Sequence, residues 1–456
     1  MEQGPHVADR PAEARRILAL AWPVMLTSLN WTVLHVTDVV VVGLVSVHEA
    51  AALSASRAIT FIGIVAALSW LSGVLVFAAR AEGAGDEVRT GAVLREGLVF
   101  GVLLGIAMTA LLVLGAAPLL RFVGVAEPLV APGAAVVRVI ALSYPFQLAL
   151  VAASFFLEGI SRPRRVAAVN LAAMPLNAVL AWMLATGQAG LPALGAVGAG
   201  LATAIASAVG GVAMVAAALT TPDAHRRGLR AWHAVGLGET LRGAGRLAWF
   251  GAVPALAAGL ELAGFSILIA LSTRLGEAAA HAFQIVFSIH NVTFSIALGL
   301  ASAAGVRTGN AVGEGVPHAA AGRVAIALSA AAAALGGIAV LLIVLRAPLV
   351  ALFPAEPGVA ALAAAMLLPW LPFIVFDGLQ VVLVYALRSL GDQVAAGVNG
   401  IAAFFVVTGG LGWWLVAAGW GAMALVWASG IGMVAAAALN GARFWWIVRG
   451  RARQLS

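Results

Sequence analysis

The sequence predicts an all-α polytopic membrane protein, in which twelve transmembrane helices form two parallel-repeat bundles of six helices. Three observations support this fold class. Of the 456 residues, 62% are hydrophobic and 10% are charged, whereas a soluble domain carries about 25% charged residues. Apolar stretches long enough to cross about 30 Å of hydrocarbon occur along the whole chain. Landmarks of the first half of the chain also return in the second half.

The expected spans divide the chain into two bundles with polar ends. Residues 1–16 carry both charge signs and lack the apolar region and cleavage site of a signal peptide. We expect a cytoplasmic tail at 1–16, an N-terminal six-helix bundle at 17–220, a cytoplasmic linker at 221–246, a C-terminal six-helix bundle at 247–447 and a cytoplasmic tail at 448–456. The expected spans are residues 17–45, 51–78, 93–120, 130–157, 166–187, 195–219, 247–272, 278–304, 322–346, 360–386, 395–417 and 421–447.

An internal repeat relates the two halves. Because each half has an even number of expected spans, both halves cross the membrane in the same sense, as parallel repeats about an axis along the membrane normal. Such a design predicts a central cavity between two bundles that can rock. The landmarks share one spacing (307 − 80 = 227) and are LAW at 20–22 and 247–249, Arg80 and Arg307, and Pro145-Phe146 and Pro372-Phe373.

The placement of arginine predicts the topology. All 26 basic residues are arginines. With the N-terminus inside, 21 of them lie on the inner side of the expected membrane and 5 on the outer side, and cytoplasmic loops are the ones that carry excess positive charge. The net charge of +7 then reflects loops beside anionic lipid and not nucleic-acid binding. The five expected outside are Arg57, Arg121, Arg138, Arg274 and Arg346.

Composition excludes several kinds of chemistry. The chain has no cysteine and no lysine, which removes thiol catalysis, disulfides, cysteine-ligated zinc, a Walker A lysine and a Schiff-base lysine. The HExxH, GxSxG and EF-hand motifs are absent from the sequence. The cluster GAVGAG at 195–200 looks like a phosphate loop, but no strand precedes it, so it predicts close helix packing. We expect neither an enzyme nor a cofactor.

Three carboxylates interrupt the apolar spans: Asp38 in the first, Glu261 in the seventh and Asp377 in the tenth. A charged side chain at the centre of a membrane helix costs about 2.5–3.5 kcal/mol on insertion scales. Because the scaffold repeats and these acids do not, the architecture alone does not require them. The residues one repeat away from the three acids are Phe265, Leu34 and Leu150.

Helical rise places two of these acids at similar depth. Glu261 lies 14 residues (261 − 247) from the inner end of its expected span, about 21 Å at 1.5 Å per residue. Asp377 lies 9 residues (386 − 377) from its inner end, about 14 Å. Asp38 lies 21 residues (38 − 17) in, about 31 Å and so in the outer half. We expect Glu261 and Asp377 to form one cation site, and Asp38 to act apart from them.

Buried acids of this kind suit cation coupling. A carboxyl group in a cavity can load and release a proton, whereas two carboxylates with carbonyl or amide oxygens can hold a dehydrated Na⁺, so Na⁺ is possible at Glu261 and Asp377. The alternative is a structural acid that is bonded to a neighbouring hydroxyl or amide. For Asp38 the nearest such groups in the sequence are His35 and Thr37. Intramembrane acids usually line paths or cavities, which favours the functional interpretation.

Four segments resemble one transporter family. They are LNWTVLHVTDVVVVG (29–43), LELAGFSILIALSTRLGEAAAHAFQI (260–285), RTGNAVGEG (307–315) and FDGLQVVLVYALRSLGDQ (376–393). With the twelve spans in two parallel halves, the whole chain resembles the multidrug and toxin extrusion (MATE) family, in its NorM-like branch. The resemblance implies a V-shaped, alternating-access antiporter of the bacterial inner membrane. Such a protein is a monomer in membrane lipid that exports small organic cations in exchange for Na⁺ or H⁺.

The resemblance also implies roles for single residues. Asp38 is similar to the helix-1 aspartate that is tied to proton coupling in the family. Glu261 and Asp377 are similar to the helix-7 and helix-10 acids of the NorM cation site. The DinF-like branch often has an aspartate in the fifth helix, where this chain has Asn170 and Asn177. This difference favours the NorM-like branch and leaves the coupling ion open.

Other polar and aromatic residues are candidates for the substrate cavity. Trp31 and Trp70 could stack on flat cations. Each polar candidate could instead serve as an interhelical hydrogen-bonding group. The polar candidates are Asn30, His35, Asn177, Gln284, His290, Asn291 and Gln380.

Two other functions compete with drug efflux. A lipid-linked oligosaccharide flippase of the same superfamily would need cationic residues in its cavity to hold a phosphate, but here the deep charges are acidic and the arginines are expected at the edges. A membrane-integral enzyme would need a clustered nucleophile or metal set. The eight histidines are scattered along the chain, and no two of them form a ligand pair at helical spacing within a span.

The arginine distribution makes a testable prediction about topology. A single cysteine at Gly228, in the expected linker of this cysteine-free chain, should resist an impermeant thiol reagent in intact cells and react after permeabilisation. Labelling of that cysteine in intact cells would contradict a cytoplasmic linker.

Overall fold

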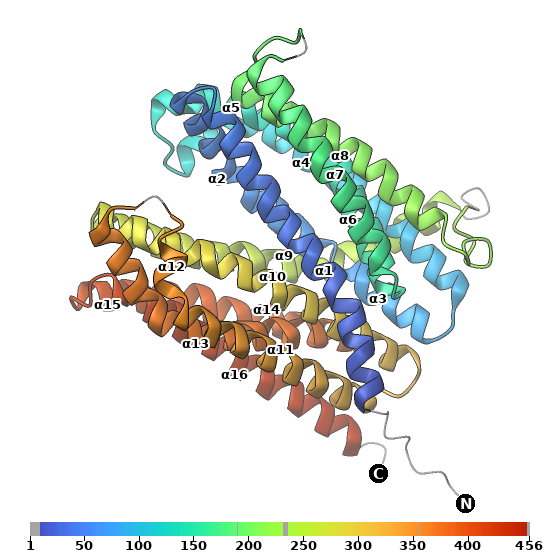
Figure 1. The fold of residues 1–456 in the computed structure, drawn as a ribbon. Coiled ribbons are helices and arrows are strands. Elements are labelled where there is room, and N and C mark those ends of the chain that lie inside the picture. The colour runs from blue at the N-terminus through green and yellow to red at the C-terminus, as the bar shows by residue number, and fades with distance from the viewer. Residues whose placement is uncertain (1–9, 189, 231–235, 354, 454–456) are drawn as a thin grey trace, which may run out of the picture. The chain divides into compact units, whose positions relative to one another are not determined.

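The computed structural model describes residues 10–188, 190–230, 236–353 and 355–453, and those residues form helices joined by short turns (Figure 1). The prediction of an all-helical fold is therefore confirmed. Parts of the expected tails and linker, at 1–9, 231–235 and 454–456, lie outside the described residues.

The helices correspond to the twelve expected spans. Along the described residues, eleven helical segments are long and apolar enough to cross a membrane, and the bent pair α5–α6 supplies a twelfth. The first half contains α1 (Arg10–Gly43), α2 (Val47–Trp70), α3 (Gly73–Gly83), α4 (Glu87–Phe122), α5 (Glu127–Ala141), α6 (Tyr144–Gly159), α7 (Pro163–Thr186) and α8 (Gly195–Leu219). The second half contains α9 (Leu237–Arg274), α10 (Glu277–Gly313), α11 (Ala319–Val344), α12 (Arg346–Val350), α13 (Pro357–Leu390), α14 (Gln393–Gly400), the π-helix η2 (Ile401–Gly410), α15 (Leu411–Ala417) and α16 (Met423–Arg453).

Three of the expected spans are interrupted. The span expected at 51–78 is divided into α2 and α3 by a turn at residues 71–72. The span expected at 130–157 is divided into α5 and α6, and the helix axis bends by 48° at the break between them. Pro145 follows the break, and proline removes a backbone N–H and disfavours helical geometry in the residue before it. The span expected at 395–417 contains η2, in which the backbone is wound more widely. There the hydroxyl of Thr408 donates to the carbonyl of Ala403, five residues earlier, at 3.3 Å.

The chain packs as two compact units. The N-terminal unit is Leu29–Ala255, and the C-terminal unit is Met1–Ser28 together with Leu256–Ser456. Both boundaries fall inside a long helix, because Ser28 belongs to α1 and Ala255 to α9. These helices are repeat equivalents, since they begin at residues 10 and 237. The expected bundles at 17–220 and 247–447 stay a prediction.

Close helix contacts hold the N-terminal unit together. There α4 packs against α5 and α6, and α8 packs against α6 and α7 (Figure 1). Gly198 of the GAVGAG segment lies so close to α7 that a Cβ would collide with the carbonyl of Leu184. The interpretation of this cluster as a packing element is confirmed. Phe156, Tyr144 and Leu148 are fully buried in the same core.

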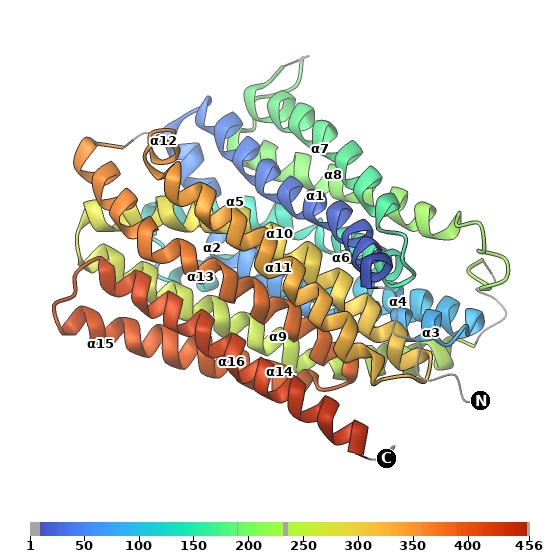
Figure 2. The same cartoon turned by 60° about the horizontal axis from the view of Figure 1, so that its bottom comes forward.

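In the C-terminal unit, α13 packs against α10, α11 and α16 (Figure 2). Trp370 of α13 is 1% exposed and packs edge-on against Phe283 of α10, with ring centroids 6.1 Å apart. The beginning of α1 joins this unit through Glu13, whose carboxylate accepts from Arg307 at 2.6 and 2.8 Å. This two-point ion pair anchors α1 to α10, and the repeat landmark Arg307 therefore has a structural role.

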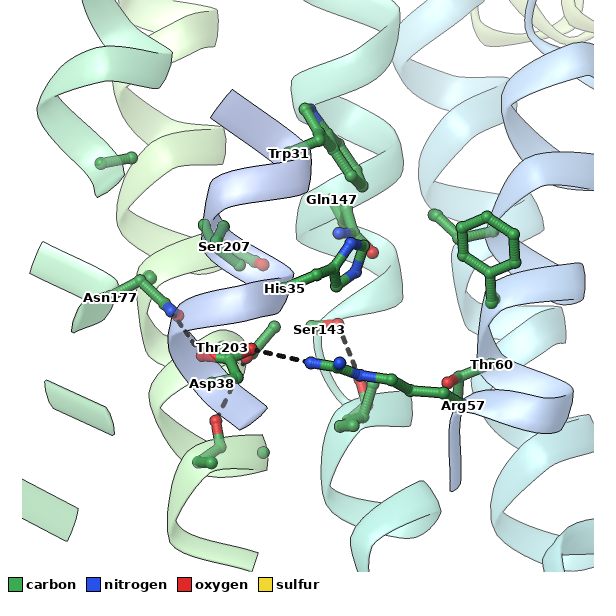
Figure 3. A pocket seen from close by; sticks show the side chains of 18 of the residues that line it. Trp31, His35, Asp38, Arg57, Thr60, Ser143, Gln147, Asn177, Thr203 and Ser207 are labelled. Atoms are coloured by element: carbon green, nitrogen blue, oxygen red, sulfur yellow. Dashed lines mark hydrogen bonds and ion pairs between the residues drawn. The ribbon is translucent and has the colours of Figure 1, made fainter. Parts of the chain in front are cut away.

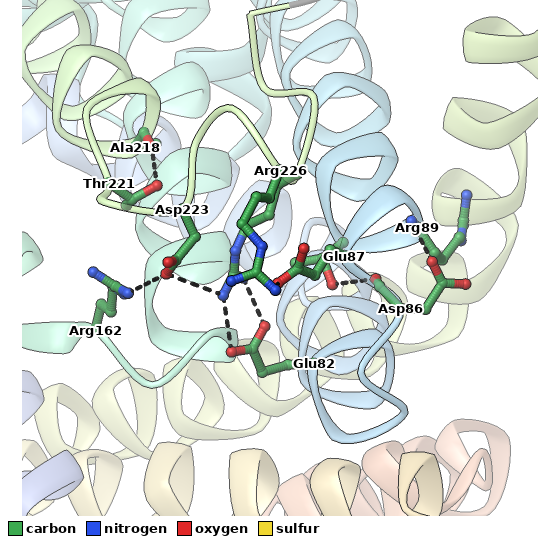
Figure 4. A network of polar contacts seen from close by, with 11 residues as sticks. Glu82, Asp86, Glu87, Arg89, Arg162, Ala218, Thr221, Asp223 and Arg226 are labelled. Atoms are coloured by element: carbon green, nitrogen blue, oxygen red, sulfur yellow. Dashed lines mark hydrogen bonds and ion pairs between the residues drawn. The ribbon is translucent and has the colours of Figure 1, made fainter.

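A network of ion pairs fastens the start of the linker to the N-terminal unit (Figure 4). Arg227 donates to both carboxylate oxygens of Glu82, at 2.6 and 3.1 Å. Asp223 accepts from Arg162 at 2.6 Å. The linker backbone also runs directly over α4, because a Cβ at Gly91 would collide with the carbonyl of Arg227. Segment 221–230 is thus held to α3, α4 and the start of α7.

The close approach of α7 and α8 predicts an effect on stability. Gly198→Ala should lower the thermal unfolding temperature of the detergent-purified protein, because overpacking costs about 1–3 kcal/mol. Gly336→Ala in α11, where a Cβ would meet nothing within 4 Å, is the matched control and should be neutral or stabilising by about 0.5–1 kcal/mol. Equal melting temperatures for the two variants would show that the contact at Gly198 is not tight.

Candidate functional site

A cavity with polar groups on mostly apolar walls lies inside the N-terminal unit, among α1, α2, α6, α7 and α8 (Figure 3). Its volume is about 120 Å³, whereas pockets that enclose a drug-sized molecule measure about 300–1,000 Å³. The cavity therefore has room for an ion, a few waters or a small group. Four sequence-predicted residues line it besides Asp38, namely Asn30, Trp31, His35 and Asn177.

Asp38 is the acid of this cavity. It is 4% exposed, and each of its carboxylate oxygens faces a donor from another helix (Figure 3). The amide nitrogen of Asn177 in α7 donates to Oδ1 at 3.0 Å. The guanidinium of Arg57 in α2 donates to Oδ2 at 3.5 Å. The carboxylate is thus held by one neutral and one cationic group.

The position of Arg57 corrects the sequence analysis. That residue was expected at the outer edge, but its guanidinium faces Asp38 and lines the cavity. α2 begins at Val47, so Arg57 is nearly three turns into the helix, where a partly buried cation requires a partner. Because Arg57 lies within the expected span 51–78, the sequence could have indicated that it is a membrane-embedded arginine in need of a partner. The suggested partner Thr37 is also wrong, because its hydroxyl donates to the carbonyl of Val33.

Two amide oxygens in the cavity have no partner. Asn30 donates its amide nitrogen to the carbonyl of Asn170 at 3.0 Å, and Asn177 donates to Asp38. The side-chain oxygens of Asn30 and Asn177 are buried and lack a hydrogen bond within the described chain. A buried acceptor without a partner costs about 1–3 kcal/mol, so both oxygens are candidate ligands for a water or an ion.

Aromatic rings form one wall of the cavity. The ring of His35 lies edge-on to Trp31 and Phe61, with centroids 6.4 and 6.3 Å apart. Trp70, the other aromatic candidate, is used differently, because its indole nitrogen donates to the carbonyl of Ala248 at 2.8 Å. Sequence reasoning missed the polar contributions of Gln147 and Thr203, which line the cavity. Neither residue has a charge or a motif that would single it out.

The second group of acids lies in the C-terminal unit. Asp377 of α13 is 4% exposed and accepts from the amide of Gln380 at 3.2 Å. The Nε2 atom of His290 in α10 lies 3.7 Å from its other oxygen. The His290 ring in turn packs edge-on against Trp370, with centroids 5.5 Å apart. Two predicted cavity residues, His290 and Gln380, are therefore direct neighbours of Asp377.

Glu261 of α9 is the partner expected for Asp377. It is partly buried, and Asp377 and Arg388 act on it electrostatically. The guanidinium of Arg388 lies 5.7 Å from the ring of Tyr385 and was not expected near the acids. Of the remaining predicted cavity residues, Gln284 and Asn291 of α10 are exposed, and their role stays a prediction.

Known proteins resemble this chain along nearly its whole length. A sequence model of the MatE family matches residues 23–183 and again 255–414. A probable multidrug resistance protein NorM from Caulobacter vibrioides is 32% identical over 411 residues, which cover 88% of this chain and 84% of the relative. The multidrug resistance protein NorM from Vibrio cholerae is 26% identical over 442 residues, which cover 95% and 96%.

Solved structures share the fold. An outward-facing multidrug resistance MATE family transporter of the MOP superfamily has a TM-score of 0.86 at 18% identity, with 99% of this chain and 100% of that chain covered. The eukaryotic MATE transporter AtDTX14 has the same TM-score of 0.86 at 18% identity, with 98% and 100% covered. At this identity the likeness concerns the fold alone.

The neighbourhood of Glu261 and Asp377 makes a prediction about energetic coupling. Glu261→Gln, Asp377→Asn and the double variant should each reduce cation-driven solute transport in proteoliposomes, and the double loss should be smaller than the sum of the single losses in free-energy terms. Glu277→Gln, at an exposed position of α10, is the matched control. Additive losses would mean that the two acids work independently.

Proposed function

Because this chain belongs to the MatE family, we propose that it is a secondary active multidrug efflux transporter that exports organic cations across the bacterial inner membrane in exchange for H⁺ or Na⁺. The relatives named multidrug resistance proteins support the drug substrates. The single observation that carries the exchange is Asp38, a buried carboxylate that lines a cavity within membrane-spanning helices. A charge in that place is expensive and is kept where it serves transport.

The size of the cavity indicates that it serves the coupling ion and not the drug. At about 120 Å³ it cannot enclose a flat organic cation, so we assign it to coupling and not to drug binding. Asp38 then acts on the drug through its charge. When the carboxylate is ionised it balances the charge of Arg57, and when it takes a proton the guanidinium is left unbalanced and repels a nearby cation. A proton that arrives from outside would thus promote release of the drug.

The acids of the C-terminal unit supply a second place for the coupling ion. The positions of the N-terminal half that correspond to Asp377 and Glu261 in the repeat hold Leu150 and Leu34. The repeated scaffold therefore does not require the two acids. His290 at 3.7 Å and the amide of Gln380 at 3.2 Å provide polar neighbours for a bound proton or Na⁺. Both acids are therefore part of the proposal, together with Asp38.

The flippase alternative needs to be weighed again because of Arg57. A cationic side chain does line the cavity, contrary to the sequence-based argument against phosphate-bearing substrates. However, Arg57 already faces the carboxylate of Asp38, so the pair contributes no net positive charge. A phosphate would need that charge, and organic-cation efflux remains the better proposal.

The proposal predicts the behaviour of an Asp38 variant. In proteoliposomes with an acidic exterior, Asp38→Asn should reduce efflux of the planar cation ethidium to the protein-free background, because the amide neither binds a proton nor balances the charge of Arg57. Glu127→Gln, which removes an exposed surface ion pair with Arg121, should transport normally, since such pairs contribute at most about 1 kcal/mol. Asp38→Glu should keep part of the activity.

The variants must insert and unfold like the original chain for this comparison to hold. An Asp38→Asn protein that is folded and still exports ethidium at the original rate, with the original pH dependence, would make Asp38 a structural residue. Coupling would then rest on the C-terminal acids.

A further inference from the structure

The contact between Arg57 and Asp38 is unusually loose for a buried ion pair. Charge-assisted N–H···O bonds normally measure about 2.7–2.9 Å, but this one measures 3.5 Å. Within the described part of the chain it is the one hydrogen bond that the Arg57 side chain makes. The Asp38 side chain is 6% exposed and that of Arg57 is 25% exposed. The guanidinium is therefore the more exposed member of the pair.

The groups around the carboxylate form a set of oxygen ligands. Besides the two oxygens of Asp38, the buried side-chain oxygen of Asn177 has no hydrogen-bond partner within the described residues. The hydroxyl of Thr203 donates its proton to the carbonyl of Ala199 at 3.1 Å, which leaves its lone pairs available. Carboxylate, amide and hydroxyl oxygens are the ligands that hard cations prefer. The cavity, at about 120 Å³, has the right scale for such an ion.

These oxygen ligands suit a cation, and the chain already places one beside them, the guanidinium of Arg57. Arg57 faces Oδ2 of Asp38, and Asn177 turns its amide N–H and not its oxygen toward Oδ1. An additional alkali ion would have to enter beside the guanidinium, where like charges repel strongly at short distance. The ion and the guanidinium therefore compete for one carboxylate.

We propose that Arg57 is a built-in counter-cation that occupies the place of an alkali ion on Asp38, so that the N-terminal cavity excludes Na⁺. This inference rests on the proposed function for its meaning, because it removes Na⁺ from the choice of coupling ions at this site. Arg57 is thus an ion-selectivity residue, and its removal creates a Na⁺ site from the oxygens of Asp38, Asn177 and Thr203.

The test is Na⁺ binding to the purified full-length chain. ²²Na⁺ binding is measured at constant ionic strength, with N-methylglucamine as the replacing cation, for the original protein, Asp38→Asn, Arg57→Gln and the double variant. The Asp38-dependent part of binding is the difference between each protein and its Asp38→Asn counterpart. We expect that part to be negligible in the original protein and its Na⁺ affinity to rise at least about tenfold in Arg57→Gln.

Three further variants separate charge from shape and folding. Arg57→Lys keeps a cation in the cavity and should still exclude Na⁺. Arg57→Met removes the charge with a different side chain and should bind Na⁺ if Arg57→Gln fails to fold. Arg138→Gln removes an arginine at an exposed position of α5 and should behave like the original protein.

Two outcomes would overturn the inference. One is Asp38-dependent Na⁺ binding in the original protein, and the other is its absence from folded Arg57→Gln and Arg57→Met proteins. Neither outcome depends on drug transport, so failure of ethidium efflux would count against the proposed function and leave this result standing.

Discussion

A buried carboxylate needs a cationic or hydrogen-bonding neighbour to replace water. The packing around Asp38 places one such neighbour at each of its two carboxylate oxygens. The helices that bring those neighbours are far apart in the sequence, because Arg57 is on α2 and Asn177 on α7. Leaving either oxygen unpaired would cost several kcal/mol. The arrangement of α1, α2 and α7 in the N-terminal unit is therefore constrained by one buried charge as well as by apolar packing.

The geometry of other ion pairs in the chain distinguishes structural acids from Asp38 and Asp377. Glu13, Glu82 and Asp392 each accept two bonds from a single arginine, with a shortest distance of 2.6 Å in every case. By contrast, the cationic partner of Asp38 is 3.5 Å away, and the histidine beside Asp377 is 3.7 Å away. Two-point pairs are strong and geometrically fixed. The looser acids are the ones that can exchange a partner, which is what cation coupling requires.

Much of the fold and part of the site follow from sequence reasoning. Apolar length and the repeat predict the spans, and the cost of an intramembrane charge singles out Asp38, Glu261 and Asp377. The break before Pro145 could also have been predicted, since proline disrupts a helix in a known way. The placement of Gly198 against α7 follows from the need of closely packed helices for small residues.

The remaining features depend on how helices are rotated and paired. Arg57 lies within a predicted span, but its contact with Asp38 requires α2 to turn that face toward α1. Asn177 is 139 residues from Asp38 in the chain, and no local pattern links them. The division of α1 and α9 between the two units has the same origin, because it reflects tertiary packing and not the composition of either helix. Hydrophobic periodicity is too weak along uniformly apolar helices to fix such rotations.

Counter-ion flux is the most direct measure of whether these buried acids couple two movements. In proteoliposomes without any imposed ion gradient, a gradient of ethidium alone should drive protons in the opposite direction. A pH-sensitive dye trapped in the lumen would report the resulting change in lumenal pH. ²²Na⁺ flux measured in the same vesicles shows whether the C-terminal acids add Na⁺ to the exchange. Movement of ethidium through the protein with neither a proton flux nor a Na⁺ flux would contradict an antiport mechanism.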